Sequence, residues 1–338
     1  MFIHFISGLE NGGTQSYLFR IIKYKLENKD HIIMYLKDGV TKKKFQELNN
    51  VIGVYSIFNA LRIILFFNKY EQAHFWLYHT YIIRLFVRSK KYIAHIRGTA
   101  TPENNLFSNF NKFFFKIAKF SLNNLRFDTI ISNSISAIYT YKSYGFLLKK
   151  YKIVYNDILV QKSFCFVFPN RDLNILNITR NDPAKNNNRF KMLVKELDSH
   201  MKFKVNIIGE GMLSFYKKNP LNIINEIHIS DTIPFEKLIK VYQETDIVII
   251  TSTNEGLPNV LLEALNYGIP VIASDAGDCQ EVLSKNPFYQ SKINNIDNHR
   301  FNIIESMNTI KTKNYGLNWS RGCDECTTYV QHNSNLFF

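Results

Sequence analysis

Two glutamates and two basic residues follow the ends of predicted strands in the second half of the chain: Glu255, Glu263, Arg180 and Lys185. Ligands of open α/β sheets bind outside the carboxyl ends of strands, where the N–H groups of a helix N-terminus favour an anion. An arginine and a lysine five residues apart at a strand end can clamp a diphosphate and neutralise the charge of a leaving group. Glu255 lies in such a turn, and Glu263 lies one turn into the next helix. In the structural alternative, Glu255 is a loop residue and Glu263 complements the helix N-terminus.

One strand, turn, helix and strand must position the two glutamates. Residues 246–252 are rich in β-branched apolar side chains, which predicts a strand covered on both faces of a parallel sheet. Pro258 suits the first position of a helix because its missing N–H would be unpaired there. Apolar residues at 260–265 supply the buried face of that helix, and Gly268 predicts its end. Residues 270–273 then form the next strand.

The whole unit resembles the Glu-x7-Glu signature of the retaining glycosyltransferases of family four, which have the GT-B fold. It reads Glu255-Gly-Leu-Pro-Asn-Val-Leu-Leu-Glu263, followed by Gly268-Ile-Pro-Val-Ile-Ala-Ser-Asp275 and Gly277. The strand, Arg180-x4-Lys185 and helix resemble a second family element, and Gly209-Glu210-Gly211 resembles its Gly-x-Gly turn. The resemblance covers most of the chain and is strongest from Arg180 to Glu281.

The resemblance implies a retaining hexosyl- or N-acetylhexosaminyltransferase that uses a nucleotide diphosphate sugar. It implies that Glu255 orients the donor sugar, that Arg180 and Lys185 stabilise the departing diphosphate, and that Glu263 binds the ribose. The remaining residues that it assigns to the donor site are Gly12, Gly13, Gly209, Gly256, Leu257, Pro258, Asn259 and Val260. The chain has no Asp-x-Asp, so we expect neither a divalent metal nor a cofactor.

The first half of the chain offers two weaker elements. Gly12 and Gly13 form a turn between a predicted strand and helix, where backbone can approach a phosphate closely, and Gln15 stands where the family often has glutamate. Many relatives direct a histidine from the end of the strand at 92–96 toward the reacting carbon. His95 or Arg97 fills that place, and the sequence leaves the choice open. The alternative for His95 is a hydrogen-bonded core residue.

The length of 338 residues suits two domains. Predicted strands alternate with helices in both halves, which indicates an α/β protein of two Rossmann-like, doubly wound domains. By the resemblance these face each other across a cleft. We expect an acceptor-binding domain at 1–165, a donor-binding domain at 170–315, and a tail at 316–338 that crosses back to the first domain. The strands are predicted at 2–7, 32–36, 52–57, 74–78, 92–96, 129–132, 152–154, 173–179, 204–208, 227–229, 246–252 and 270–273.

A formal net charge of +14 favours an anionic partner. No nucleic-acid motif is present, so we expect no nucleic acid. Residues 104–127 predict an amphipathic helix with a broad aromatic face and lysines opposite. It can rest on an anionic membrane or pack into the core, and core packing is favoured because such stripes are usually core. Membrane contact would fit a lipid-linked saccharide acceptor, as in the synthesis of O-antigen or capsule.

No apolar run reaches the length of a transmembrane helix, and the first residues lack a signal sequence. Four scattered cysteines, Cys165, Cys279, Cys323 and Cys326, predict free thiols. We therefore expect a cytoplasmic protein, at the inner face of the plasma membrane if it contacts lipid. Two other functions remain open: a nucleotide-sugar epimerase of the same fold, and a non-catalytic binder of anionic membrane or nucleic acid.

Overall fold

The computed structural model describes residues 1–10, 12–57, 70–99, 109–156 and 172–284. The chain divides into two compact units, Met1–Tyr155 and Asn156–Phe338. The expected tail at 316–338 and three of the four cysteines lie outside the described residues. So do residues 166–169, which lie between the two expected domains.

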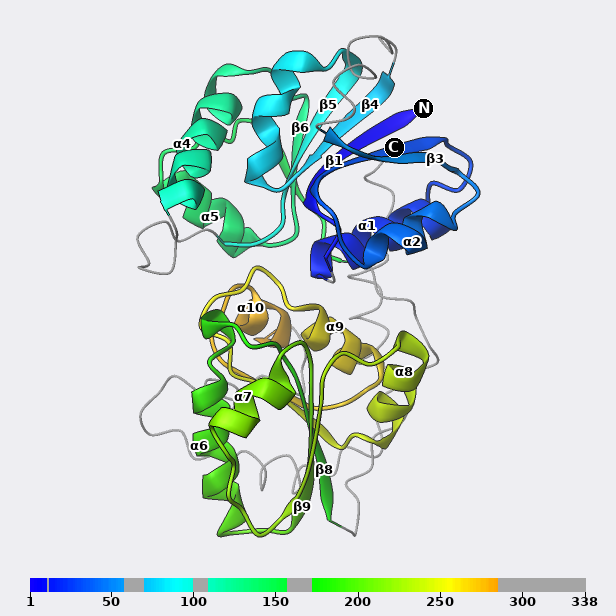
Figure 1. Cartoon of the computed structure of the whole chain (residues 1–338). Coiled ribbons are helices and arrows are strands. Elements are labelled where there is room, and N and C mark those ends of the chain that lie inside the picture. The colour runs from blue at the N-terminus through cyan, green and yellow to red at the C-terminus, as the bar shows by residue number, and fades with distance from the viewer. Residues whose placement is uncertain (11, 58–69, 100–108, 157–171, 285–338) are drawn as a thin grey trace. The chain divides into compact units, whose positions relative to one another are not determined.

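The first unit is built on a seven-stranded parallel sheet in the order β3-β2-β1-β4-β5-β6-β7 (Figure 1). Helices flank both faces of this sheet, as expected for a doubly wound domain. Its strands are β1 (Phe2–Gly8), β2 (His31–Lys37), β3 (Val51–Ser56), β4 (Tyr70–Trp76), β5 (Ser89–Ile96), β6 (Thr129–Ser132) and β7 (Tyr151–Ile153). Its described helices are α1 (Gly13–Tyr24), α2 (Thr41–Gln46), the 3-10 helix η1 (Tyr78–Phe86), α4 (Asn109–Asn124) and α5 (Ile135–Ser143).

The second unit is built on a five-stranded parallel sheet in the order β10-β9-β8-β11-β12. Its strands are β8 (Leu173–Ile178), β9 (Phe203–Ile208), β10 (Glu226–Ser230), β11 (Ile247–Ile250) and β12 (Val271–Ala273). Its described helices are η2 (Pro183–Lys185), α6 (Asn187–Asp198), α7 (Met212–Lys218), α8 (Phe235–Glu244), α9 (Asn259–Asn266) and α10 (Cys279–Ser284). The predicted doubly wound α/β architecture is therefore confirmed in both units.

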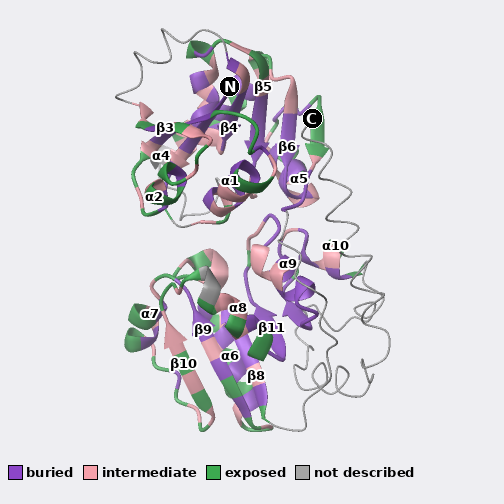
Figure 2. Ribbon diagram, turned by 90° about the vertical axis from the view of Figure 1, so that its right-hand side faces the viewer, coloured by how far each residue is buried: buried purple, intermediate pink, exposed green. Residues whose placement is uncertain are grey.

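Buried apolar side chains explain why these segments form strands covered on both faces. All four residues of β11 are buried, as the run of β-branched residues predicts for a central parallel strand (Figure 2). Gly268 ends α9 with a positive φ of 69°, and the N–H of Ile269 donates to the carbonyl of Ala264 at 2.9 Å. The predicted end of this helix is thus confirmed. The start differs by one residue, because Pro258 is the N-cap and α9 begins at Asn259.

The predicted basic-aromatic helix packs into the core along only one side. Phe115 and Ala118 of α4 are buried in the core of the first unit. Phe113 and Phe120, in contrast, are 59% and 56% exposed, on the same side of the helix as Lys116. Core packing is therefore confirmed for Phe115, and the prediction that the lysines lie opposite all the aromatic residues is wrong.

Candidate active site

The strands β8 and β11 are neighbours in the second sheet, and the chain leaves them toward opposite edges. The loop after β8 leads through α6 to β9, whereas the loop after β11 leads through α9 to β12. Such a reversal of strand order is the topological switch point at which open α/β sheets bind ligands. The first loop carries Arg180 and Lys185, and the second carries Glu255.

Lys185 and Glu255 form an ion pair across this switch point. The two side chains are 23% and 14% exposed, so both charges are largely removed from water. Asp182 positions the lysine by capping the short helix η2, because its Oδ1 accepts a hydrogen bond from the N–H of Ala184 at 2.9 Å. Asn186 then turns the chain with a left-handed φ of 51°, a conformation that asparagine tolerates.

Two threonines fix the β8 loop to the end of β11. The hydroxyl of Thr251 donates to the carbonyl oxygen of Lys185 at 3.1 Å, and the N–H of Thr253 donates to the carbonyl oxygen of Ala184 at 2.8 Å. The backbone of the loop that carries Lys185 is thus held in place by the strand that leads to Glu255.

Arg180 lies in the same loop, but its guanidinium does not point to Glu255. Its Nε and Nη2 both donate to Oδ2 of Asp182, at 3.0 and 2.7 Å. The pair is partly exposed, 53% for Arg180 and 29% for Asp182, and surface ion pairs contribute about 0–1 kcal/mol. An anionic ligand could therefore redirect this guanidinium at little cost.

The turn before α9 is supported by backbone contacts from the turn that follows β12. The N–H of Asp278 donates to the carbonyl oxygen of Gly256 at 2.8 Å, and Gly277 has a positive φ of 63°. A Cβ on Gly277 would overlap the carbonyl oxygen of Gly256. Leu257 is buried, whereas Val260 is half-buried on the first turn of α9. These contacts fix the backbone between Glu255 and the helix N-terminus.

Tyr242 of α8 is a site residue that the sequence did not indicate. Its hydroxyl donates to Oε2 of Glu263 at 2.8 Å, and its ring stacks on Tyr267 with centroids 5.0 Å apart. Burial and the Glu263 carboxylate raise the pKa of Tyr242 well above its usual value, so the hydroxyl keeps its proton. Glu263 is therefore oriented by a neutral hydrogen-bond donor.

Gly209 follows β9 and lies against Thr179, the residue before Arg180. Its φ of 149° is one that L side chains rarely adopt, and a Cβ would fall on the carbonyl oxygen of Thr179. We expect Gly209→Ala to lower the free energy of unfolding by at least about 2–3 kcal/mol, through strain and overlap. Urea unfolding followed by circular dichroism measures this. Gly98→Ala, which meets no atom within 4 Å, is the control, and equal effects of the two variants would contradict the assignment.

Gly12 and Gly13 belong to the first unit, at the start of α1. Gly12 is the N-cap, with an extended backbone, and its carbonyl oxygen accepts a hydrogen bond from the N–H of Ser16 at 3.0 Å. The side-chain amide of Gln15 donates to the carbonyl oxygen of Gly8 at 2.8 Å. Gln15 therefore closes the turn, and its amide is engaged within the protein.

His95 lies in a row of four buried imidazoles on adjacent strands of the first unit. His31, His4, His74 and His95 come from β2, β1, β4 and β5. His95 stacks on Trp76 with centroids 3.7 Å apart and planes at 10°. A role for His95 beside the reacting carbon stays a proposal.

Hydrogen bonds indicate which ring nitrogen of each imidazole in this row donates and which accepts. The carbonyl oxygen of Leu26 accepts from Nε2 of His31 at 3.1 Å, so Nδ1 of His31 accepts from Nε2 of His4 at 2.9 Å. Nδ1 of His4 in turn accepts from the indole N–H of Trp76 at 3.3 Å.

The other half of the row follows the same rule. Oε1 of Gln72 accepts from Nε2 of His74 at 3.1 Å, and Nδ1 of His74 accepts from Nε2 of His95 at 3.0 Å. All four rings are therefore neutral, with the proton on Nε2. Burial is the largest cause that lowers their pKa values, to about 3 for His74.

Arg97, the other candidate in this segment, packs against the same row. Its guanidinium lies 3.9 Å from the ring centroid of Tyr17 and 5.8 Å from that of Trp76. Burial lowers the pKa of Arg97 to about 10, so the side chain stays charged at neutral pH. The row thus ends against a cation.

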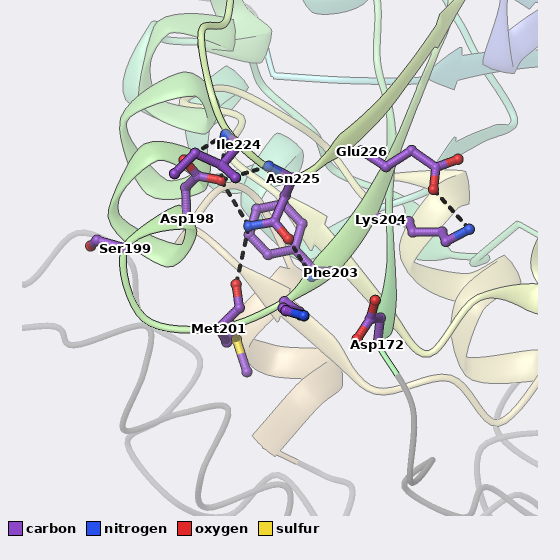
Figure 3. Close-up of a pocket in the computed structure, with 10 residues that line it drawn as sticks. Asp172, Asp198, Ser199, Met201, Phe203, Lys204, Ile224, Asn225 and Glu226 are labelled. Carbon is purple, nitrogen blue, oxygen red and sulfur yellow. Dashed lines mark hydrogen bonds and ion pairs between the residues drawn. The ribbon is translucent and has the colours of Figure 1, made fainter.

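A surface pocket lies at the amino ends of β9 and β10, which is the edge of the second sheet opposite to Lys185 and Glu255 (Figure 3). Several of its polar groups pair with one another. Asp198 accepts from the N–H of Asn225 at 3.0 Å, and Lys204 pairs with Glu226 at 2.7 Å. We assign this pocket a structural role, and its ion pair provides a control for experiments on the site.

Comparison with known proteins gives a family match within the second half of the chain. Residues 162–292 match the family model of glycosyl transferases group 1. A segment of 113 residues, 32% of this chain, is 31% identical to the amylovoran biosynthesis glycosyltransferase AmsD of Erwinia amylovora. The matched segment spans 31% of that relative.

Two solved structures resemble the whole chain in fold. HepE of Anabaena, in complex with UDP-glucose, has a TM-score of 0.75 at 16% identity, covering 99% of this chain and 98% of its own. WaaG, a glycosyltransferase involved in lipopolysaccharide biosynthesis, has a TM-score of 0.70 at 10% identity, covering 98% and 95%. The chain therefore has the GT-B fold, and its sequence match to group 1 glycosyl transferases supports a GT-B glycosyltransferase.

Proposed function

We propose that this protein is a retaining glycosyltransferase that moves a hexosyl or N-acetylhexosaminyl group from a nucleotide diphosphate sugar to a hydroxyl of a saccharide. The observation that carries the proposal is the Lys185–Glu255 pair at the switch point, beside the N-terminus of α9. The UDP-glucose complex of HepE supports a nucleotide-sugar donor.

A diphosphate that enters beside α9 would compete with Glu255 for the ammonium of Lys185. The Glu255 carboxylate could then accept hydrogen bonds from hydroxyls of the donor sugar. Arg180 can turn from Asp182 to the same diphosphate, because an exposed ion pair contributes little. The two cations and the N–H groups of α9 stabilise the charge that develops on the leaving group.

Glu263, fixed by Tyr242, is proposed to bind the ribose of the donor. Transfer with retention proceeds by attack of the acceptor hydroxyl on the face that the diphosphate leaves, which requires positioning and charge stabilisation and no covalent nucleophile of the protein. Gly12 and Gly13, at the start of α1, are retained as proposed donor contacts. The anomeric configuration of the transferred sugar, read by NMR, tests retention.

The acceptor is proposed to be a lipid-linked saccharide of cell-surface polysaccharide synthesis, such as O-antigen or capsule, at the inner face of the plasma membrane. AmsD is a glycosyltransferase of amylovoran biosynthesis and WaaG one of lipopolysaccharide biosynthesis, which supports this class of pathway. Among the described residues, no helix is long and apolar enough to cross a bilayer.

Hydrolysis of a panel of nucleotide sugars tests the donor site. We expect slow release of nucleotide from one donor, and a loss of about ten- to a hundred-fold in Arg180→Ala, because one charge-assisted contact is removed. Arg126→Ala is the matched control, since Arg126 forms an exposed pair with Asp128 at 3.3 Å. Conversion of donor without nucleotide release would indicate an epimerase, and no response to any donor would contradict the proposal.

Removal of divalent metal tests the second feature of the mechanism. We expect EDTA to leave nucleotide release unchanged within about two-fold, because Lys185, Arg180 and the α9 N-terminus supply the positive charge at the diphosphate. Rate measurements with EDTA and then with added Mg²⁺ or Mn²⁺ check this. A loss that Mg²⁺ restores would show that a metal holds the diphosphate.

A further inference from the structure

We propose that one side of the first unit is a docking surface for an anionic lipid bilayer. This surface, called the α4 surface below, consists of Phe113, Lys116, Lys119, Phe120 and Leu147 (α4 and the turn after α5 in Figure 1). All five side chains are exposed. The proposal does not rest on the transferase activity, and the two can fail separately.

The spacing on α4 places its two exposed rings on one line. Phe113, Lys116 and Phe120 follow one another at i, i+3 and i+7, which is one side of a helix. The two rings stand about 10 Å apart along the axis, with the lysine between them. The opposite side of α4 is already anchored in the core by Phe115 and Ala118. The exposed rings therefore belong to a fixed helix.

The turn after α5 extends the α4 surface. Asn123, one turn beyond Phe120, donates from Nδ2 to the carbonyl oxygen of Gly145 at 3.1 Å and accepts from the N–H of Leu147 at 2.7 Å. Leu147 is thereby held beside the C-terminal half of α4. Lys119 reaches the same turn, where its Nζ would lie 2.7 Å from a Cβ on Gly145. Three apolar side chains and two lysines thus share one face.

The charge around the α4 surface is almost entirely positive. Residues 109–156 contain eight basic residues and one acidic residue, Asp128, which pairs with Arg126. Four more exposed lysines follow α4 in the chain, on α5, in the turn after it and on β7: Lys142, Lys149, Lys150 and Lys152. An anionic lipid surface attracts such a cluster with about 1 kcal/mol for each basic residue near it.

The combination of rings and lysines favours a bilayer over other occupants. A second copy of the chain would bring like charges together. A nucleic acid would use the lysines and the two rings, but it would leave the aliphatic Leu147 without a partner. At a bilayer interface the phenylalanines and the leucine enter the boundary of the acyl chains while the lysines stay at the headgroups.

Co-sedimentation of the full chain with vesicles tests the proposal. We expect binding to vesicles of phosphatidylglycerol and phosphatidylcholine in equal parts, weak binding to phosphatidylcholine alone, and a loss of binding as salt is raised. Phe113→Ser with Phe120→Ser should lower the affinity at least about ten-fold. Lys116→Gln and Lys119→Gln should each lower it roughly five-fold.

Tyr24→Ser is the matched control, because Tyr24 is 48% exposed beside Lys23 on α1. Tyr17 of α1 packs on Trp76, on the sheet face opposite to the core that holds α4. Each variant is first checked for an unchanged unfolding temperature and unchanged nucleotide release. Vesicle binding without transferase activity would leave this proposal standing and sink the proposed function.

Four results would overturn the proposal. They are equal binding to both vesicle types, no binding to either, an equal loss in Tyr24→Ser, and tighter binding to single-stranded DNA than to anionic vesicles. Self-association that the two phenylalanine substitutions abolish would assign the α4 surface to a second copy of the chain instead.

Discussion

Replacing Lys185 by alanine is expected to lower kcat/KM for the donor by about 10³-fold, since removal of one preorganised donor to a developing anion costs about 10²–10³ in rate. Two consequences combine in this variant. The leaving diphosphate loses a cation, and the Glu255 carboxylate, 14% exposed, loses its ion-pair partner. Initial rates of nucleotide release over a range of donor concentrations give the change.

A double-mutant cycle separates these consequences. Glu255→Gln keeps the shape of the side chain, and we expect the loss in the double variant to be smaller than the product of the two single losses, because groups that share one interaction are not additive. Lys204→Ala is the control, as it breaks an ion pair at the opposite edge of the same sheet. A loss of less than about ten-fold in Lys185→Ala would remove this lysine from the site.

Acidification is expected to destabilise the first unit more than an ordinary domain. The four buried histidines have folded pKa values below the unfolded value of 6.5. Their contribution to stability is therefore complete above that value and is lost as the pH falls toward the folded pKa values. We expect a loss of roughly 1 kcal/mol for each ring that stays neutral, and about 3–4 kcal/mol for the row, when the pH is lowered from 6.5 to about 5.5.

Trp76 lies within the row and provides the signal for this measurement. The chain has two tryptophans, and Trp319→Phe leaves Trp76 as the single tryptophan emitter. Urea unfolding of this variant at each pH gives the slope of stability against pH. His74→Asn should reduce the number of protons bound on unfolding, which this slope gives, by about one, because asparagine does not titrate. Asparagine still offers a donor and an acceptor in place of the ring. The exposed His228→Asn is the control, and a slope that His74→Asn leaves unchanged would contradict the assignment.

The strands and the central part of the site could be predicted because their signals are local. The β-branched run at 246–252, Gly268 and the turn with Glu255 each act within a few residues, and the structure has β11, α9 and β12 there. The approach of Lys185 to Glu255 follows from topology, since both loops start at the carboxyl ends of two adjacent parallel strands. The resemblance to a known family suggested the roles.

Other features depend on contacts between distant residues. Tyr242 meets Glu263 through the packing of α8 on α9, and no local pattern selects this tyrosine among the 19 in the chain. The strand β4 ends earlier than predicted because Leu77 adopts a positive φ of 71° and η1 begins after it. No glycine at this position indicates the change of direction. The histidine row has a partial signal in the sequence, since His4, His74 and His95 all stand inside apolar strand segments.

The hydrogen bonds from Thr251 and Thr253 to the β8 loop bear on how such enzymes can be recombined. They make two distant stretches of sequence into one part of the proposed donor site. A chimera whose crossover falls between residues 187 and 251 would take these stretches from different parents and would have to rebuild their fit. A crossover at the start of the second unit would inherit both from one parent, which makes that position the natural place to exchange donor specificity.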